Sequence, residues 1–147
     1  VAVGRMLKQL PLQRIAYNAI PSVVYTNPEI ACIGLTEKDL NDIKEGDFAP
    51  SMSTDKPFVP YEVHKLPMTY SGRFVAENEG ETGLCKVIVD QRNKTIIGVH
   101  MIGNPCSEFV AAASFAVRMG YTVGEFKQVV FPHPTVGEVL REVIAEL

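Results

Sequence analysis

The sequence predicts an α+β fold, in which a mainly antiparallel sheet has helices packed on one side. Two runs rich in β-branched residues, 84–90 and 95–103, are joined by the four-residue loop QRNK and predict a hairpin. Helical segments follow this hairpin, and the chain lacks the alternating series of strands and helices that a parallel sheet requires. Helices gathered on one face of an antiparallel sheet fit this order of elements best.

The composition is that of an ordinary globular protein. The 147 residues are 46% hydrophobic and 21% charged, which is sufficient for one domain with a core. No apolar run approaches the roughly 20 residues that cross a bilayer, so we expect no membrane segment and no signal peptide. The formal net charge of −3 argues against nucleic acid as a partner. Because the chain begins at Val1 without an initiator Met, we expect a fragment.

The first elements are two strands preceded by a connector. A short helix is expected over 1–9, ended by Pro11, and a connector over 13–22. The run SVVYT at 22–26 predicts a strand, and EIACIGL at 29–35 predicts a second one.

A helix over 37–44 should follow these strands. Thr36 is a suitable N-cap, and Asp39 stands where a loose capping box needs a carboxylate. Gly46 is expected to end the helix, because glycine accepts the left-handed conformation that closes many helices.

The middle of the chain is rich in proline. Strands are possible around 47–53 and 61–68, with a Pro-rich excursion between them. Proline lacks an N–H donor, so these strands should lie at an edge of the sheet or be interrupted. The stretch 70–83 is expected to form a loop or a single turn.

The segment SEFVAAASFAVRMG at 107–120 predicts a helix, capped by Ser107 and ended by Gly120. It is apolar on nearly every side, and such a helix must be covered on every side. Two arrangements satisfy this requirement: a fully buried central helix, or a helix covered in part by another subunit or domain.

Two further helices are expected at the C-terminal end. Thr122 and Glu125 form a capping box for a short helix over 122–128. The tail TVGEVLREVIAEL has the apolar spacing of an amphipathic helix. Its apolar positions are Val136, Val139, Leu140, Val143, Ile144 and Leu147.

The cysteines and two of the histidines have structural explanations. Cys32, Cys85 and Cys106 are odd in number and far apart, which fits neither a disulfide framework nor a metal site. We interpret them as half-buried thiols in a reducing compartment. His64 is expected on a strand surface, and His100 as a strand histidine with its hydrogen bonds satisfied.

His133 stands between two prolines in FPHPTVGE, and this segment has two interpretations. In the first, Thr135 and Glu138 form a capping box for the last helix, and His133 is a turn residue. In the second, Pro132 and Pro134 stiffen the backbone around His133, and Glu138 accepts a hydrogen bond from its ring. A histidine oriented in this way could exchange protons with a thiol, as the base and its orienting carboxylate do in a catalytic triad.

Several stretches resemble the flavin-dependent disulfide reductases. HPTVGE, followed by VLREVI, is similar to their H-P-T-x-x-E motif, with the dihydrolipoamide dehydrogenase branch as the best match. Further stretches agree in order, at 20–37, 72–90 and 96–120. The resemblance implies that residues 21–147 are the C-terminal dimerisation (interface) domain of a pyridine nucleotide-disulfide oxidoreductase. Residues 1–20 would be the tail of the preceding flavin-binding domain or a linker.

The resemblance also implies a role for the site. His133 would be the acid/base for the redox cysteine pair of the partner subunit in a homodimer, and Glu138 would hold its ring. His133 and Pro134 would approach the partner's flavin. The helix at 107–119 and the last helix would be candidates for the dimer interface. The substrates would be the dihydrolipoyl groups of 2-oxo acid dehydrogenase complexes, in the cytoplasm or, in a eukaryote, the mitochondrial matrix.

The chain carries only part of this machinery. A glycine-rich flavin phosphate loop, a nicotinamide domain and a C-x-x-x-x-C pair are absent from the sequence. FAD and NAD are therefore expected in the full-length enzyme, and we expect this chain alone to hold no cofactor or metal and to be inactive. Two alternatives remain: the equivalent domain of a glutathione-type reductase, and a dimerisation module without chemistry.

Overall fold

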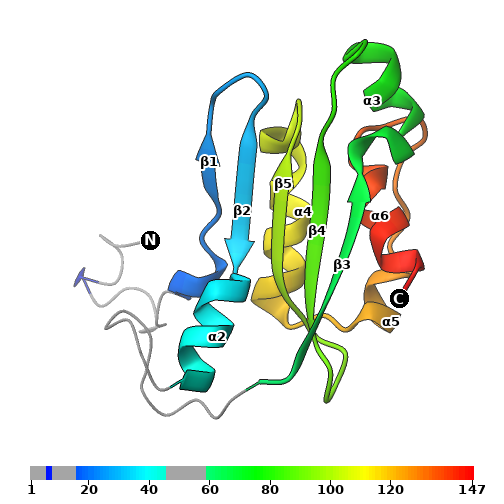
Figure 1. Cartoon of the computed structure of the whole chain (residues 1–147). Helices are drawn as coiled ribbons and strands as arrows, with labels where there is room; N and C mark the ends of the chain where they lie inside the picture. The colour runs from blue at the N-terminus through cyan, green and yellow to red at the C-terminus, as the bar shows by residue number, and fades with distance from the viewer. Residues whose placement is uncertain (1–5, 8–15, 46–58) are drawn as a thin grey trace.

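The protein is a five-stranded antiparallel sheet with helices on both faces (Figure 1). The computed structural model describes residues 6–7, 16–45 and 59–147, and these contain the sheet in the strand order β1-β2-β5-β4-β3. Each neighbouring pair of strands is antiparallel, as predicted. The strands are β1 (Ser22–Val24), β2 (Ile30–Gly34), β3 (Tyr61–Pro67), β4 (Leu84–Asp90) and β5 (Ile96–Ile102).

The predicted hairpin lies at the centre of the sheet. Val87 of β4 pairs with Val99 of β5, and Cys85 pairs with Met101. These side chains are buried, because alternate residues of each strand face the main core. Strand β3 occupies the edge next to β4, as expected for a segment with proline at its end. The expected strand at 47–53, the stop at Gly46 and most of the expected helix at 1–9 lie outside the described residues.

Helices α4 (Cys106–Met119) and α6 (Glu138–Ala145) cover one face of the sheet. Helix α4 packs on β2 and β5, whereas α6 packs on β3 and β4. The last helix has the predicted apolar stripe, with Val139, Leu140, Val143 and Ile144 all buried. Short helix α5 (Val123–Phe126) joins them and begins with the predicted capping box between Thr122 and Glu125.

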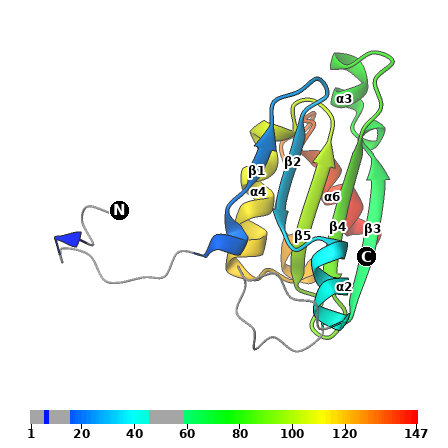
Figure 2. The same cartoon turned by 60° about the vertical axis from the view of Figure 1, so that its left-hand side comes forward.

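Helix α2 (Glu37–Glu45) lies on the opposite face of the sheet (Figure 2). Its first residue, Glu37, accepts a hydrogen bond at 2.8 Å from Lys86, whose neighbours Cys85 and Val87 point into the main core. Leu40 of α2 is fully buried on that side. Thr36 and Asp39 form the expected reciprocal cap, since Asp39 N–H donates to Thr36 Oγ1 and Thr36 N–H donates to Asp39 Oδ2. The prediction that helices pack on one side of the sheet is therefore confirmed for α4 and α6, whereas α2 packs on the other face.

Helix α4 differs from both its expected start and its expected burial. It begins at Cys106 after Pro105, and Ser107 is not its cap: Ser107 N–H donates instead to Glu29 Oε2 at 2.9 Å. Gly120 ends it in the left-handed conformation, as predicted. Phe115 is 68% exposed on the face away from the sheet, so a fully buried central helix is wrong for the described part of the chain.

The stretch expected to be a loop or a single turn contains helix α3 (Gly72–Glu77). Ser71 caps it by accepting from Phe74 N–H at 3.2 Å. Burial of the Phe74 ring contributes the stabilisation that so short a helix lacks on its own. Two short 3-10 helices, η1 (Tyr17–Ala19) and η2 (Met68–Tyr70), complete the fold. No helix in the described ranges is both long and apolar enough to span a membrane.

Candidate functional site

The loop between α5 and α6 presents His133 to the outside of the domain. The His133–Pro134 peptide bond is cis. The His133 side chain is 81% exposed, whereas the Glu138 side chain beneath it is only 10% exposed. The domain therefore buries the carboxylate and leaves the imidazole ring accessible.

His133 and Glu138 are in direct contact. His133 Nδ1 lies 3.0 Å from Glu138 Oε1 and 3.2 Å from Oε2. A carboxylate can only accept hydrogen bonds, so Nδ1 donates and carries a proton. In the neutral ring, the lone pair is then on Nε2, the nitrogen free to accept a proton from outside.

Glu138 is held from a second direction by the backbone. Thr135 N–H donates to Glu138 Oε2 at 2.8 Å. This hydrogen bond, followed by the contact with His133, holds the pKa of Glu138 below its ordinary value and outweighs the opposing effect of burial. The carboxylate is therefore charged at neutral pH, where it can stabilise an imidazolium ion.

The predicted capping box at this helix is only half formed. Glu138 reaches back to the Thr135 backbone as expected, but the Thr135 hydroxyl does not cap the helix. It donates instead to the Pro132 carbonyl at 2.8 Å, and α6 begins after Gly137 without a side-chain cap. Within this tight loop the Thr135 hydroxyl bonds to the Pro132 carbonyl and is not used to cap α6. Glu138 thus makes both of the contacts that the sequence left as alternatives, one to the Thr135 backbone and one to the His133 ring.

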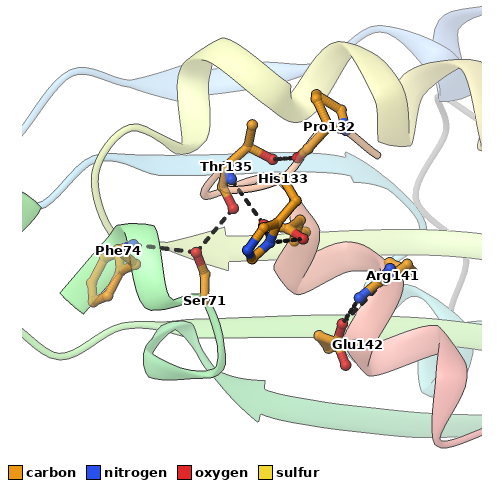
Figure 3. Close-up of polar contacts among 8 residues, drawn as sticks. Ser71, Phe74, Pro132, His133, Thr135, Arg141 and Glu142 are labelled. Carbon is orange, nitrogen blue, oxygen red and sulfur yellow. Dashed lines mark hydrogen bonds and ion pairs between the residues drawn. The ribbon is translucent and has the colours of Figure 1, made fainter. Parts of the chain in front are cut away.

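Ser71 is the member of this arrangement that sequence reasoning missed. Its Oγ–H donates to the Thr135 carbonyl at 3.0 Å, across 64 residues of chain (Figure 3). Serine is a preferred N-cap residue, so the sequence could have suggested that Ser71 begins a helix and accepts from the N–H of Phe74, three residues later. No local pattern connects it to the loop.

The other histidines are structural. His100 Nε2 lies 2.9 Å from the Leu35 carbonyl, so this nitrogen donates, and burial lowers the pKa of His100. His64 lies on edge strand β3, with Nε2 4.0 Å from a Glu62 carboxylate oxygen. Both lie on strands, as expected, and their polar partners are outside the His133 loop.

The three cysteines are free thiols. Burial raises the pKa of Cys85 to about 12 and that of Cys106 to about 11, and it also raises the pKa of Cys32. Such thiols are poor nucleophiles at neutral pH. In the described ranges, no group of three or more His, Cys, Asp or Glu side chains could hold a metal ion.

The flavin implied by the resemblance fits this site only as a neighbour. A groove beside the loop is lined by Arg73, Glu77, Pro105, Glu108, Phe109, Pro134, Thr135, Val136 and Gly137. Its lining combines two prolines, backbone and the Phe109 ring with three charged side chains, those of Arg73, Glu77 and Glu108. An exposed loop of this kind can meet a ring held by another chain, with His133 and Pro134 at its tip.

The five-stranded antiparallel sheet with its helices has the fold of a flavin disulfide reductase dimerisation domain. Residues 20–144 match the family model of the pyridine nucleotide-disulphide oxidoreductase dimerisation domain, so the chain belongs to this family. More particularly, it is the dimerisation domain of a disulfide oxidoreductase similar to dihydrolipoyl dehydrogenase.

Two curated relatives carry the sequence comparison. The mitochondrial dihydrolipoyl dehydrogenase of Caenorhabditis elegans is 36% identical over 128 residues, which cover 87% of this chain and 23% of that protein. Dihydrolipoyl dehydrogenase of Thermus scotoductus is 36% identical over 123 residues, covering 84% and 23%. The chain thus spans about a quarter of the length of the curated relatives it matches.

Solved structures agree on the fold. LpdA from Mycobacterium tuberculosis superposes with a TM-score of 0.78 at 21% identity, over 99% of this chain and 28% of that one. The HOCl-induced flavoprotein disulfide reductase RclA from Escherichia coli gives a TM-score of 0.69 at 18% identity, over 86% and 26%.

Proposed function

We propose that this domain supplies the acid/base group of an FAD- and NAD-dependent dihydrolipoamide dehydrogenase. His133 would act on the redox-active sulfur pair of the partner subunit in a homodimer, and Glu138 would orient and charge-stabilise its ring. The observation that carries the proposal is the contrast within one contact: an exposed imidazole held at 3.0 Å by a buried carboxylate. A histidine that served only to form a turn would not need an exposed ring held by a buried carboxylate.

The chemistry assigned to these residues is proton transfer. A dithiol must lose protons before its sulfurs can attack a disulfide, because the thiolate is the nucleophile. His133 Nε2 accepts such a proton, and Glu138 stabilises the resulting imidazolium from the Nδ1 side. Flavin and NAD, bound by other parts of the enzyme, would accept the electrons.

The chain's own thiols support a division of labour. Cys85 and Cys106 are buried with strongly raised pKa values, and burial also raises the pKa of Cys32, which supports a reacting sulfur pair supplied by another chain. We therefore propose that the chain is inactive on its own. By resemblance we also propose that residues 21–147 form the interface domain and that residues 1–20 are the tail of a preceding flavin-binding domain or a linker.

The substrate and compartment follow the relatives. Both relatives compared by sequence are dihydrolipoyl dehydrogenases, which favours dihydrolipoyl groups of 2-oxo acid dehydrogenase complexes over glutathione as the substrate. These relatives include a mitochondrial and a bacterial enzyme, so the compartment would be the mitochondrial matrix in a eukaryote and the cytoplasm in a bacterium.

His133→Gln in the intact enzyme tests the proposal. Glutamine can still contact Glu138 but cannot carry a proton at neutral pH, so we expect dihydrolipoamide-dependent reduction of NAD to fall by roughly 10²- to 10⁴-fold. His64→Gln, which changes a surface histidine away from the site, should leave turnover unchanged. If His133→Gln turned over at the wild-type rate, the domain would be a dimerisation module without an acid/base role.

A further inference from the structure

A buried serine from a distant part of the chain anchors the histidine loop. Ser71 is 2% exposed and lies at the start of α3. Its hydroxyl oxygen accepts from Phe74 N–H at 3.2 Å, and its proton goes to the Thr135 carbonyl at 3.0 Å (Figure 3). One hydroxyl therefore connects the first turn of α3 to the loop.

Thr135 transmits this anchor to the site. Its carbonyl accepts from Ser71, while its N–H donates to Glu138 at 2.8 Å. Glu138 in turn holds His133 Nδ1. Each step is one hydrogen bond, so a shift of Thr135 would move one partner of the Glu138 carboxylate and, through it, the His133 ring.

Few other polar contacts hold this loop. The Thr135 hydroxyl bonds to Pro132, inside the loop and exposed to solvent, so it does not fix the loop relative to the sheet. Within the described ranges, only one side chain from outside residues 131–138 forms a hydrogen bond to the loop, and it is that of Ser71. Val136 and Phe131 pack the ends of the loop against the core, but the His133 ring itself is largely exposed and is not held by packing.

We propose that Ser71 is a positioning residue for His133, acting through Thr135 and Glu138. The inference rests on the proposed function, since it concerns how well the acid/base group is aimed. Loss of the hydroxyl leaves the Thr135 carbonyl without this partner and frees the loop to shift. Displacement of a catalytic group by about 1 Å can cost on the order of 100-fold in rate.

A purely structural serine would behave differently. If Ser71 served only to cap α3, its removal would lower stability and leave the chemistry unchanged. Thr36 offers a matched comparison, because it caps α2 on the opposite face of the sheet with similar geometry, accepting from Asp39 N–H at 3.1 Å. Thr36→Ala should therefore reproduce the loss of a cap without affecting the loop.

The experiment is a double-mutant cycle in the intact enzyme, with dihydrolipoamide oxidation measured from pH 5.5 to pH 9. Ser71→Ala should lower kcat by about 10-fold with little change in KM for NAD, because only the proton-transfer group is misplaced. In the His133→Gln background, Ser71→Ala should cause less than about a 2-fold further loss. Ser71→Thr, which keeps the hydroxyl, should restore most of the activity.

The outcomes separate this inference from the proposed function. If His133→Gln lowers kcat but Ser71→Ala does not, or if Ser71→Ala acts equally in both backgrounds, the positioning role is overturned. If His133→Gln itself has no effect, the acid/base function fails, and the inference fails with it. Should Ser71→Ala fold poorly, Ser71→Gly removes the same hydroxyl with a smaller loss of capping, and the same criteria apply.

Discussion

The two side chains of the contact between His133 and Glu138 lie in different environments, because the carboxylate is buried and the imidazole ring is exposed. Burial would raise the pKa of Glu138, but the Thr135 N–H and the His133 ring together lower it. The carboxylate is thus kept charged by partners that also fix its position. The ring remains in contact with solvent, where a second molecule can reach Nε2.

The charge on Glu138 should make its contribution to stability depend on pH. Its folded-state pKa lies below the ordinary value of 4.5, so the charged form stabilises the fold above that pH, and this contribution is lost as the pH falls through the folded-state pKa. Urea unfolding of wild type and Glu138→Gln should therefore show a gap in the free energy of unfolding at pH 5.5 that narrows toward pH 3. Asp90, whose pKa is also lowered, is present in both proteins and cancels. A gap that widened in acid would contradict this assignment.

The buried cysteines should be chemically silent while the domain is folded. With pKa values of about 12 and about 11, Cys85 and Cys106 are thiolates in roughly one molecule in a thousand or fewer at pH 8. We expect a coloured disulfide reagent to label the partly exposed Cys32 first and the other two only as the domain unfolds. In urea all three should react at once. Rapid labelling of Cys85 in the native chain would show that its burial is incomplete.

Helices in this domain end through backbone geometry as much as through packing. Gly120 closes α4 with φ 67° and ψ 38°, a conformation that side chains with a Cβ disfavour. Gly72, in the first turn of α3, has an ordinary backbone conformation. A Cβ at either position would meet no atom within 4 Å. The two glycines therefore differ in backbone strain and not in available space.

Alanine substitution should change stability in opposite directions at these two positions. Gly120→Ala should lower the free energy of unfolding by about 1–2 kcal/mol, because the left-handed conformation becomes strained. Gly72→Ala should be neutral or should raise it by up to about 1 kcal/mol, by restricting the unfolded chain. Urea unfolding midpoints measure both effects. Equal losses at the two positions would mean that close contacts, not the backbone, decide the outcome.

At the scale of the whole molecule, the residues that the structure describes leave one side of α4 uncovered. Phe115 and Met119 are 68% and 64% exposed on a helix whose other side packs on the sheet. Glu108 and Phe109, near the start of the same helix, line the groove beside Pro134, so the surface of α4 adjoins the histidine loop there. A partner subunit on that surface would cover α4 and meet His133 together, as the proposed function requires.

Phe115→Glu should weaken the proposed homodimer without unfolding the domain. The side chain is largely exposed in one copy, so the charge costs little until a partner buries it. Sedimentation of the intact protein should show a dimer dissociation constant raised by about 30-fold or more, the effect of losing an aromatic anchor worth about 2 kcal/mol. Asn41→Glu adds the same charge on α2, on the opposite face, and should leave the dimer unchanged. A full-strength Phe115→Glu dimer would place the interface elsewhere.

Much of this architecture could be read from neighbouring residues. The hairpin of β4 and β5, the caps at Thr36 and Thr122, the end of α4 at Gly120 and the apolar stripe of α6 all depend on residues within a few positions of one another. The contact between His133 and Glu138 also belongs to this group, because a single tight loop contains both residues. Short-range sterics and hydrogen bonding set these features wherever the rest of the chain lies.

Other features required the assembled fold. Helix α2 lies opposite α4 and α6, Glu29 takes the Ser107 N–H that a local cap would have used, and Ser71 bonds to Thr135 across 64 residues. The half-exposed position of α4 likewise follows from which strands it covers. These choices depend on how separate elements share one core and on which polar groups are buried together. A pattern of adjacent residues therefore predicts that a histidine can be held by a carboxylate, whereas the distant anchor of its loop emerges only when the chain is packed in three dimensions.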